Sequence, residues 1–193
     1  MKTAARVAIL LLFLLASGCQ SLPGTGGRVR VGSTTAPESR MAAELYAALL
    51  EKNGIAVERR FDLGDGKKAM DALVAGRIDI YPETVQRAYL DLMQMNDGDT
   101  DPASVFDKVS KYYQRRYQIV WLAPSPLEDG NQIAPVIRSD TLKANPGAQD
   151  ALDRLAKALD EAALKELSRK VSSGKADAAA AAQDYLRQNG LIQ

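Results

Sequence analysis

The sequence has 193 residues, of which 46% are hydrophobic, and its formal net charge is +1 at pH 7. This balance gives no basic excess to neutralise phosphates, so nucleic acid is not expected as a partner. The chain has no histidine and a single cysteine, which excludes Ser-His-Asp and Cys-His catalytic sites, histidine metal sites and an intramolecular disulfide. Catalysis by carboxylates, lysines or tyrosines stays open, but no motif points to it, so we expect no enzyme activity, no cofactor and no metal site.

The first residues have the pattern of an export signal. Two basic residues precede an apolar run, Val7 to Ala16, which is too short to span a bilayer of about 30 Å but suits the core of a signal peptide. Ala16-Ser17-Gly18-Cys19 then places small residues before the single cysteine, and this pattern resembles the lipobox of bacterial lipoproteins. The alternative is an ordinary secretory peptide with a chance cysteine. We predict a lipoprotein signal peptide over residues 1–18 and lipidation of Cys19.

The segment after the cysteine predicts how the chain is attached. Residues 20–27 are rich in glycine and small polar side chains, so 19–27 is expected to be a lipidated cysteine with a flexible tether. Without residues 1–18 the chain has 23 basic and 24 acidic residues, a net charge of −1, and residues 28–193 have the length of one domain. Gln20 is not the aspartate that holds some lipoproteins on the inner membrane. We expect a lipid-anchored protein on the periplasmic side of the cell envelope, with the outer membrane favoured where there is one.

The first half of the domain alternates between strand and helix patterns. Arg28 to Ser33 alternates polar and apolar residues, as a strand with one buried face does. The segments that follow are a helix over 39–53, a strand over 55–61, a helix over 67–75, a strand over 78–81 ended by Pro82, and a helix over 84–95. This order predicts an α/β fold with a largely parallel sheet flanked by helices.

The second half continues with helices around two more strands. We predict a helix from Pro102 to about Tyr113, strands over 118–122 and 132–138, and helices over 147–159, 161–171 and 176–189, with Asp160 as the N-cap of the second of these. The acidic loop over 96–101 lacks the spacing of an EF-hand, so we interpret it as a solvated loop.

Ligands of open parallel sheets bind beyond the carboxyl ends of the strands. Those ends are 33–38, 62–66, 81–84 and 123–131. Tyr81 would offer a π face that attracts quaternary ammonium groups, and Glu83 would add Coulombic attraction. The alternative is that Tyr81 packs at the rim of the core and Glu83 caps the next helix. Asp79 is expected to make structural hydrogen bonds.

Several motifs resemble one family of transport proteins. Val31-Gly32-Ser33, Leu63-Gly64 and the run Ala72 to Glu83, read as ALVAGRIDIYPE, resemble the osmoprotectant substrate-binding proteins of ABC importers. Val120 to Pro124 and Pro135 to Arg138 resemble the family's hinge and C-terminal segments. The resemblance implies that the chain folds as one lobe of a type II periplasmic binding protein. It also implies two partners, which are a small quaternary-amine solute such as glycine betaine or choline and an ABC permease subunit. The positions that it and the strand ends assign to the ligand are Ser33, Thr34, Glu38, Gly64, Tyr81, Glu83, Thr84 and Asn131.

Two features depart from the family. Its members have two lobes, the second inserted into the first, whereas here the hinge-like segments meet across 123–131 and an insertion of about a hundred residues is absent. We predict a single lobe over 28–193, with a dimer or another protein to complete the binding cleft. The family also continues Tyr-x-Glu with Tyr-Thr-Gly-Thr, where this chain has Thr84-Val85-Gln86-Arg87.

These observations lead to two hypotheses of function. The first is a lipid-anchored substrate-binding component of an ABC importer for osmoprotectants, with altered specificity. The alternative is a single-lobe envelope interaction module that has lost solute binding.

Overall fold

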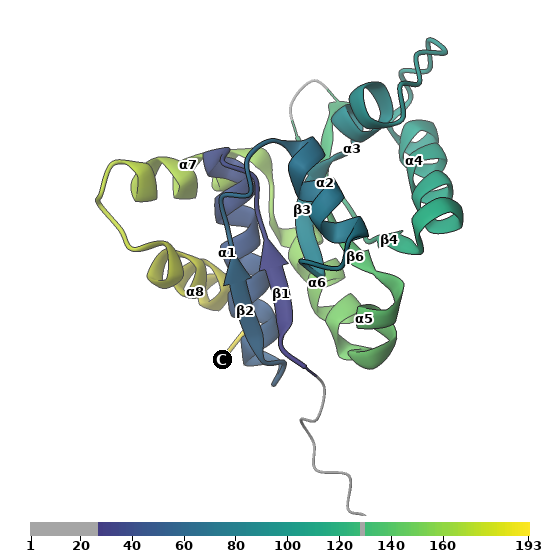
Figure 1. Cartoon of the computed structure of the whole chain (residues 1–193). Coiled ribbons are helices and arrows are strands. Elements are labelled where there is room, and N and C mark those ends of the chain that lie inside the picture. Colours follow the sequence, from purple (N-terminus) through teal and green to yellow (C-terminus); the bar gives the residue numbers. More distant parts are fainter. Residues whose placement is uncertain (1–26, 128–129) are drawn as a thin grey trace, which may run out of the picture.

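The computed structural model describes residues 27–127 and 130–193 of the chain (Figure 1). The predicted signal peptide, Cys19 and all but the last residue of the predicted tether lie outside these residues. Among the described helices, none combines the length and the apolar character needed to cross a membrane.

Six strands form a single sheet. Strands β2, β1, β3, β6 and β4 lie side by side in that order, and β5 pairs with β6. Their bounds are β1 Val29–Gly32, β2 Val57–Arg60, β3 Ile80–Thr84, β4 Ile119–Trp121, β5 Ser125–Pro126 and β6 Gln132–Arg138. β1 is parallel to β2 and β3, whereas β6 is antiparallel to β3, β4 and β5, so that every strand except β6 runs in the same direction. The predicted α/β fold, a sheet flanked by helices, is confirmed, but the sheet is mixed, because the three strand pairings made by β6 are antiparallel and the other two are parallel.

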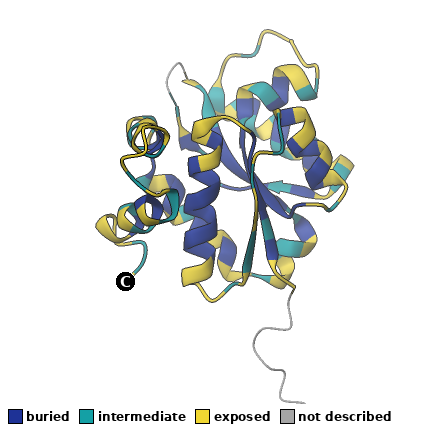
Figure 2. Ribbon diagram, turned by 60° about the vertical axis from the view of Figure 1, so that its left-hand side comes forward, coloured by how far each residue is buried: buried dark blue, intermediate teal, exposed yellow. Residues whose placement is uncertain are grey.

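Helices cover both faces of this sheet (Figure 2). Their bounds are α1 Pro37–Lys52, α2 Gly66–Val74, α3 Val85–Arg87, η1 Ala88–Leu92, α4 Pro102–Tyr117, α5 Ser139–Ala144, α6 Gly147–Ala158, α7 Glu161–Ser172 and α8 Ala178–Gln188. One core lies between the sheet and α1, α6, α7 and α8, and a second lies between the sheet and α2, η1 and α4. β6 contributes to both, because Ile133 and Ile137 face the first core while Ala134 and Val136 face the second. The result is a three-layer arrangement.

Aspartates fix the starts of four helices. The side chain of Asp160 accepts a hydrogen bond of 2.8 Å from the backbone N–H of Ala163, which confirms its predicted role as the N-cap of α7. Asp65, Asp101 and Asp177 cap α2, α4 and α8 in the same way.

Asp79 ties the first strand to the third, in agreement with its predicted structural role. Its carboxylate accepts hydrogen bonds from the backbone N–H of Arg30 at 2.8 Å and from the Nε and Nη2 groups of that arginine at 2.8 and 2.7 Å. The residue is 6% exposed, so these bonds replace the water that a carboxylate loses on burial.

The third strand and the helix after it differ from the sequence prediction. β3 does not end at Pro82 but runs through it to Thr84, with Pro82 paired opposite Pro135 of β6. Two prolines can face each other in an antiparallel ladder because alternate residue pairs exchange no hydrogen bonds. The predicted helix over 84–95 is shorter and wider than expected. It consists of α3 and then the π-helix η1, where the N–H of Met93 donates to the carbonyl of Ala88 five residues earlier.

Candidate functional site

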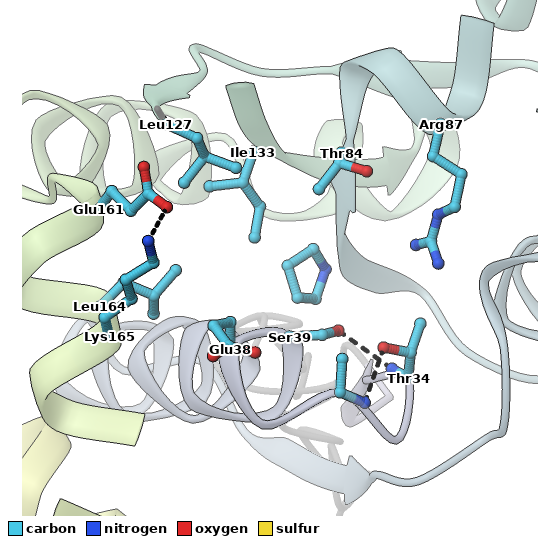
Figure 3. Close-up of a pocket in the computed structure, with 12 residues that line it drawn as sticks. Thr34, Glu38, Ser39, Thr84, Arg87, Leu127, Ile133, Glu161, Leu164 and Lys165 are labelled. Carbon is cyan, nitrogen blue, oxygen red and sulfur yellow. Dashed lines mark hydrogen bonds and ion pairs between the residues drawn. The ribbon is translucent and has the colours of Figure 1, made fainter. Parts of the chain in front are cut away.

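A cavity of about 320 Å³ opens at the carboxyl ends of β1 and β3 (Figure 3). This is the place where ligands bind in open α/β sheets. Three groups of residues surround it: the start of α1 with the loop before it, the end of β3 with α3, and α7 with the strand β6. The lining residues are Thr34, Ala36, Glu38, Ser39, Pro82, Thr84, Arg87, Leu127, Ile133, Glu161, Leu164 and Lys165.

The first wall is the N-terminus of α1. The backbone N–H of Thr34 donates to Ser39 Oγ at 3.1 Å, and Thr34 Oγ1 accepts from the N–H of Ala36 at 3.3 Å, so the loop is held close to the first turn. The N-cap residue Ala36 offers no side chain to cap the helix, and Glu38 lies exposed in the first turn. Helix N-termini attract negative charge, and here the carboxylate of Glu38 already supplies it, so this wall presents an acidic side chain to the cavity.

The second wall contains a buried carboxylate beneath an arginine. Glu83 is fully buried, and its Oε2 accepts a 2.8 Å hydrogen bond from the Tyr81 hydroxyl. Glu83 Oε1 accepts from the backbone N–H of Thr84 at 2.7 Å and from Arg87 Nε at 2.8 Å, and it also pairs with Arg87 Nη2. Burial raises the pKa of the Glu83 carboxyl, while the guanidinium of Arg87 and the hydrogen bonds oppose that rise. Burial also raises the pKa of the Tyr81 hydroxyl, which keeps it protonated as a donor.

Arg87 rests on the first residue of α2. A Cβ added to Gly66 would lie 2.3 Å from Arg87 Cζ, so the guanidinium occupies the space that any side chain at this position would need. A side chain at position 66 would therefore displace the guanidinium. Arg87 is thereby held between Gly66 and Glu83, at the edge of the cavity.

The third wall comes from α7, which is distant in sequence from the other two. Leu164 is 1% exposed, and Lys165 Nζ pairs with Glu161 at 2.6 Å one turn away on the same helix. Together with Leu127 and Ile133 these residues form the mostly aliphatic side of the cavity (Figure 3).

The structure separates the predicted ligand positions into two groups. Thr34, Glu38 and Thr84 line the cavity together. The remaining five positions do not line it. Ser33 is buried, and its Oγ accepts from the backbone N–H of Asp62 at 3.1 Å.

Gly64 and Asn131 also have structural partners. The carbonyl of Gly64 accepts from the N–H of Thr35 at 2.9 Å, which holds the loop before α2 against the loop before α1. Asn131 lines a separate, smaller hollow, and its Oδ1 accepts from the N–H groups of Gln86 and Gln132 at 3.3 and 2.8 Å.

The positions of Tyr81 and Glu83 agree better with the alternative interpretation, in which Tyr81 packs in the core and Glu83 bonds the start of the next helix, than with a role in ligand binding. Tyr81 is 0% exposed, belongs to the core under α2 and α4, and is not among the residues that line the cavity. Glu83 is buried too and bonds the N–H at the start of α3. No tyrosine, tryptophan or phenylalanine is found among the cavity-lining residues of the described chain.

Sequence reasoning missed Arg87 and the whole of the α7 wall. Arg87 carried a signal, because it stands where the resembled family has a threonine. The α7 residues carried none, since their approach depends on long-range packing. Within residues 27–127 and 130–193, no cluster of three or more carboxylate or thiol side chains could hold a metal ion.

Comparison with known proteins identifies a family. The sequence profile of the substrate-binding domain of ABC-type glycine betaine transport systems matches residues 27–134 and, separately, residues 114–188. Glycine betaine-binding protein YehZ of Escherichia coli (strain K12) is 27% identical over 118 residues, which are 61% of this chain and 38% of YehZ. The ergothioneine transport permease/ergothioneine binding protein EgtU of Helicobacter pylori (strain G27) is 25% identical over 120 residues, which are 60% of this chain and 21% of EgtU. The match therefore spans well under half the length of either relative.

Solved structures show the same fold. The structure of apo YehZ from Escherichia coli superposes with a TM-score of 0.77 at 17% identity, and the alignment covers 86% of this chain and 100% of that one. A crystal structure of a glycine betaine/carnitine/choline ABC transporter gives a TM-score of 0.75 at 9% identity, with the same coverage. At these identities the likeness concerns the fold, and it agrees with the predicted resemblance to a lobe of a periplasmic binding protein.

Proposed function

Because the chain belongs to the family of substrate-binding domains of ABC-type glycine betaine transport systems, we propose that it is a single-lobe, lipid-anchored solute-binding component of an ABC importer for osmoprotectants. Members of this family are binding proteins and not enzymes, in agreement with the sequence prediction. The solute class is that of glycine betaine and related quaternary amines, and the partner is a permease subunit.

One observation carries the proposal: the cavity lies at the carboxyl ends of β1 and β3, the edge at which open α/β sheets bind their ligands. Its volume of about 320 Å³ falls within the range of small-molecule sites. Thr34, Ser39 and Thr84 bring hydroxyl groups to it, and Leu127, Ile133 and Leu164 bring aliphatic surface. Hydroxyl groups and four charged side chains converge there on an aliphatic surface, a combination that suits a small polar solute.

The single-lobe form is supported by the connection between β4 and β6. Only ten residues, 122–131, join these neighbouring antiparallel strands, and β5 lies among them. Two separate matches to one family profile are also expected if the middle of the profile has no counterpart in this chain. A single lobe leaves one side of the solute in water. We expect weak binding by the isolated chain and tighter binding once a second copy or the permease closes the cleft.

The proposal includes a lipid anchor that holds this site outside the cytoplasm. We propose cleavage before Cys19, lipidation of its thiol, and attachment on the periplasmic side, with the outer membrane as the favoured destination. Expression of the whole chain followed by membrane fractionation tests this part. The wild type is expected with the membranes and the Cys19→Ser variant in the soluble periplasmic fraction, and a soluble wild type would contradict the anchor.

Isothermal titration calorimetry tests solute binding. Glycine betaine, choline and carnitine are titrated into the whole chain and into a Thr84→Trp variant, whose indole fills the cavity. We expect saturable heats with at least one of these solutes for the wild type and none for the variant. If all three give only heats of dilution, solute binding is refuted. Retention of an envelope protein from membranes in the absence of solute would then support the interaction module instead.

A further inference from the structure

Four charged side chains line the cavity, and two of them satisfy each other. Glu161 and Lys165 form an ion pair along α7. The other two, Arg87 and Glu38, lie on opposite sides of the cavity, Arg87 from α3 and Glu38 from the first turn of α1 (Figure 3). The cavity therefore has a positive end and a negative end.

The positive end is rigid and accessible. Arg87 Nε and Nη2 both bond Glu83 Oε1, and the guanidinium lies against Gly66, so the side chain has little freedom to turn. Its Nη1 has no hydrogen-bond partner among the described residues, and 31% of the side chain remains exposed. An arginine held by one carboxylate can still present a free N–H edge to another carboxylate.

Glu83 does not cancel this charge for a solute in the cavity. Its side chain is 0% exposed, and both of its oxygens accept hydrogen bonds from Tyr81, Thr84 and Arg87. A solute in the cavity can therefore contact the guanidinium of Arg87, whereas the carboxylate of Glu83 is covered.

In the part of the chain that the structure describes, the cavity also lacks the aromatic side chains that hold a cation without a carboxylate. Quaternary ammonium groups are held by aromatic faces, and no aromatic side chain lines this cavity within the described residues. Thr84 stands where the resembled family continues with tyrosine, and Arg87 stands where it has threonine. A cation placed near α3 would be repelled by the guanidinium, whereas a carboxylate would be attracted.

We propose that the cavity selects zwitterionic solutes that carry a carboxylate over cations that lack one, and that Arg87 is the residue that determines this specificity. The solute's carboxylate bonds Arg87 Nη1, and its ammonium group lies toward Glu38. This inference rests on the proposed function, because it names the subclass of solutes that the same cavity takes.

Glycine betaine and choline form a matched pair of probes. Both carry a trimethylammonium group, but glycine betaine has a carboxylate where choline has a hydroxymethyl group. We expect the wild-type chain to bind glycine betaine about tenfold more tightly than choline, the difference made by one charge-assisted hydrogen bond at a partly exposed site. In Arg87→Gln, binding of glycine betaine weakens about tenfold and binding of choline tightens, since the repelling cation is gone and Glu83 is left unpaired.

A second arginine serves as the control. Arg59 pairs with the buried Glu44 as Arg87 pairs with Glu83. The side chains of Arg59 and Glu44 are 33% and 5% exposed, and those of Arg87 and Glu83 are 31% and 0% exposed. Arg59 does not line the cavity. Arg59→Gln should leave the ratio of the two affinities unchanged. If Arg87→Gln does not fold, the double variant Glu83→Gln/Arg87→Gln removes both charges and should bring the two affinities together.

The outcomes separate this inference from the proposed function. Equal wild-type affinities for the two probes, or a ratio that survives Arg87→Gln, would overturn the inference and leave the proposed function standing. Binding of neither probe would refute both.

Discussion

Removal of Arg87 is expected to destabilise the fold as well as to change specificity. In Arg87→Gln the Glu83 carboxylate stays fully buried and loses its ion pair, keeping only the hydrogen bonds from Tyr81 and Thr84. Breaking one side of a buried ion pair costs about 3–5 kcal/mol. Arg87 is 31% exposed, so water can reach the site, and we expect a loss of about 2 kcal/mol. Urea unfolding at pH 7, followed by circular dichroism, measures it.

The loss should depend on pH in a defined direction. Burial raises the pKa of Glu83 above its ordinary value of 4.5, and removal of the guanidinium takes away a charge that opposes the rise. A carboxyl group whose pKa is higher in the folded state contributes stability that is complete below the unfolded-state pKa. That contribution is lost as pH rises through the folded-state value. The difference between wild type and Arg87→Gln should therefore shrink as pH is lowered from 7 to 4.

The double variant Glu83→Gln/Arg87→Gln is the control for this reasoning, because it has no carboxyl group to titrate at this position. Its stability relative to the wild type should not follow the pH course of the single variant. A loss below about 0.5 kcal/mol for Arg87→Gln at pH 7 would refute the account of Glu83 as a buried charge held by its arginine. A loss of equal size at pH 7 and pH 4 would refute it too.

Three further changes test other parts of the structure. Asp79→Asn should lower the free energy of unfolding by about 2 kcal/mol, because Arg30 loses a charged acceptor at a nearly buried site, and an unchanged urea midpoint would contradict this. Gly66→Ala should weaken glycine betaine binding about tenfold by displacing Arg87, and an unchanged affinity in calorimetry would show that the guanidinium does not reach the solute. Gln118→Gly should raise the free energy of unfolding by about 1 kcal/mol, because residue 118 ends α4 with a φ of 57°, and a lower melting temperature would count against this.

The order of elements could be predicted because it depends on local patterns. Alternation over Val29 to Gly32, apolar periodicity in α1, and an aspartate at position 160 before α7 each specify a local conformation. The reversal of β6 could not be predicted in the same way, since Gln132 to Arg138 shows burial and not direction. Strand direction is set by which neighbours β6 meets, and those contacts are long-range.

Only part of the candidate site could be predicted, because some of its residues are placed by local patterns and others by long-range contacts. The rule that ligands gather at strand ends singled out Thr34, Glu38 and Thr84, and the structure brings these three residues to one cavity. It failed for Tyr81, because the strand was expected to end at Pro82. In the structure β3 continues for three residues beyond Tyr81, so Tyr81 lies within the strand, where alternation directs it into the core under α2 and α4.

Occupation of the cavity between α1, β3 and α7 by a small solute underlies both the proposed function and the role of Arg87. Nuclear magnetic resonance with glycine betaine titrated into the isotope-labelled whole chain tests it most directly. The account predicts that amide shifts concentrate at Thr34, Ser39, Thr84 and Leu164 and that they saturate. Shifts confined to the separate hollow between Met70 and Tyr117, or no shifts at all, would contradict it.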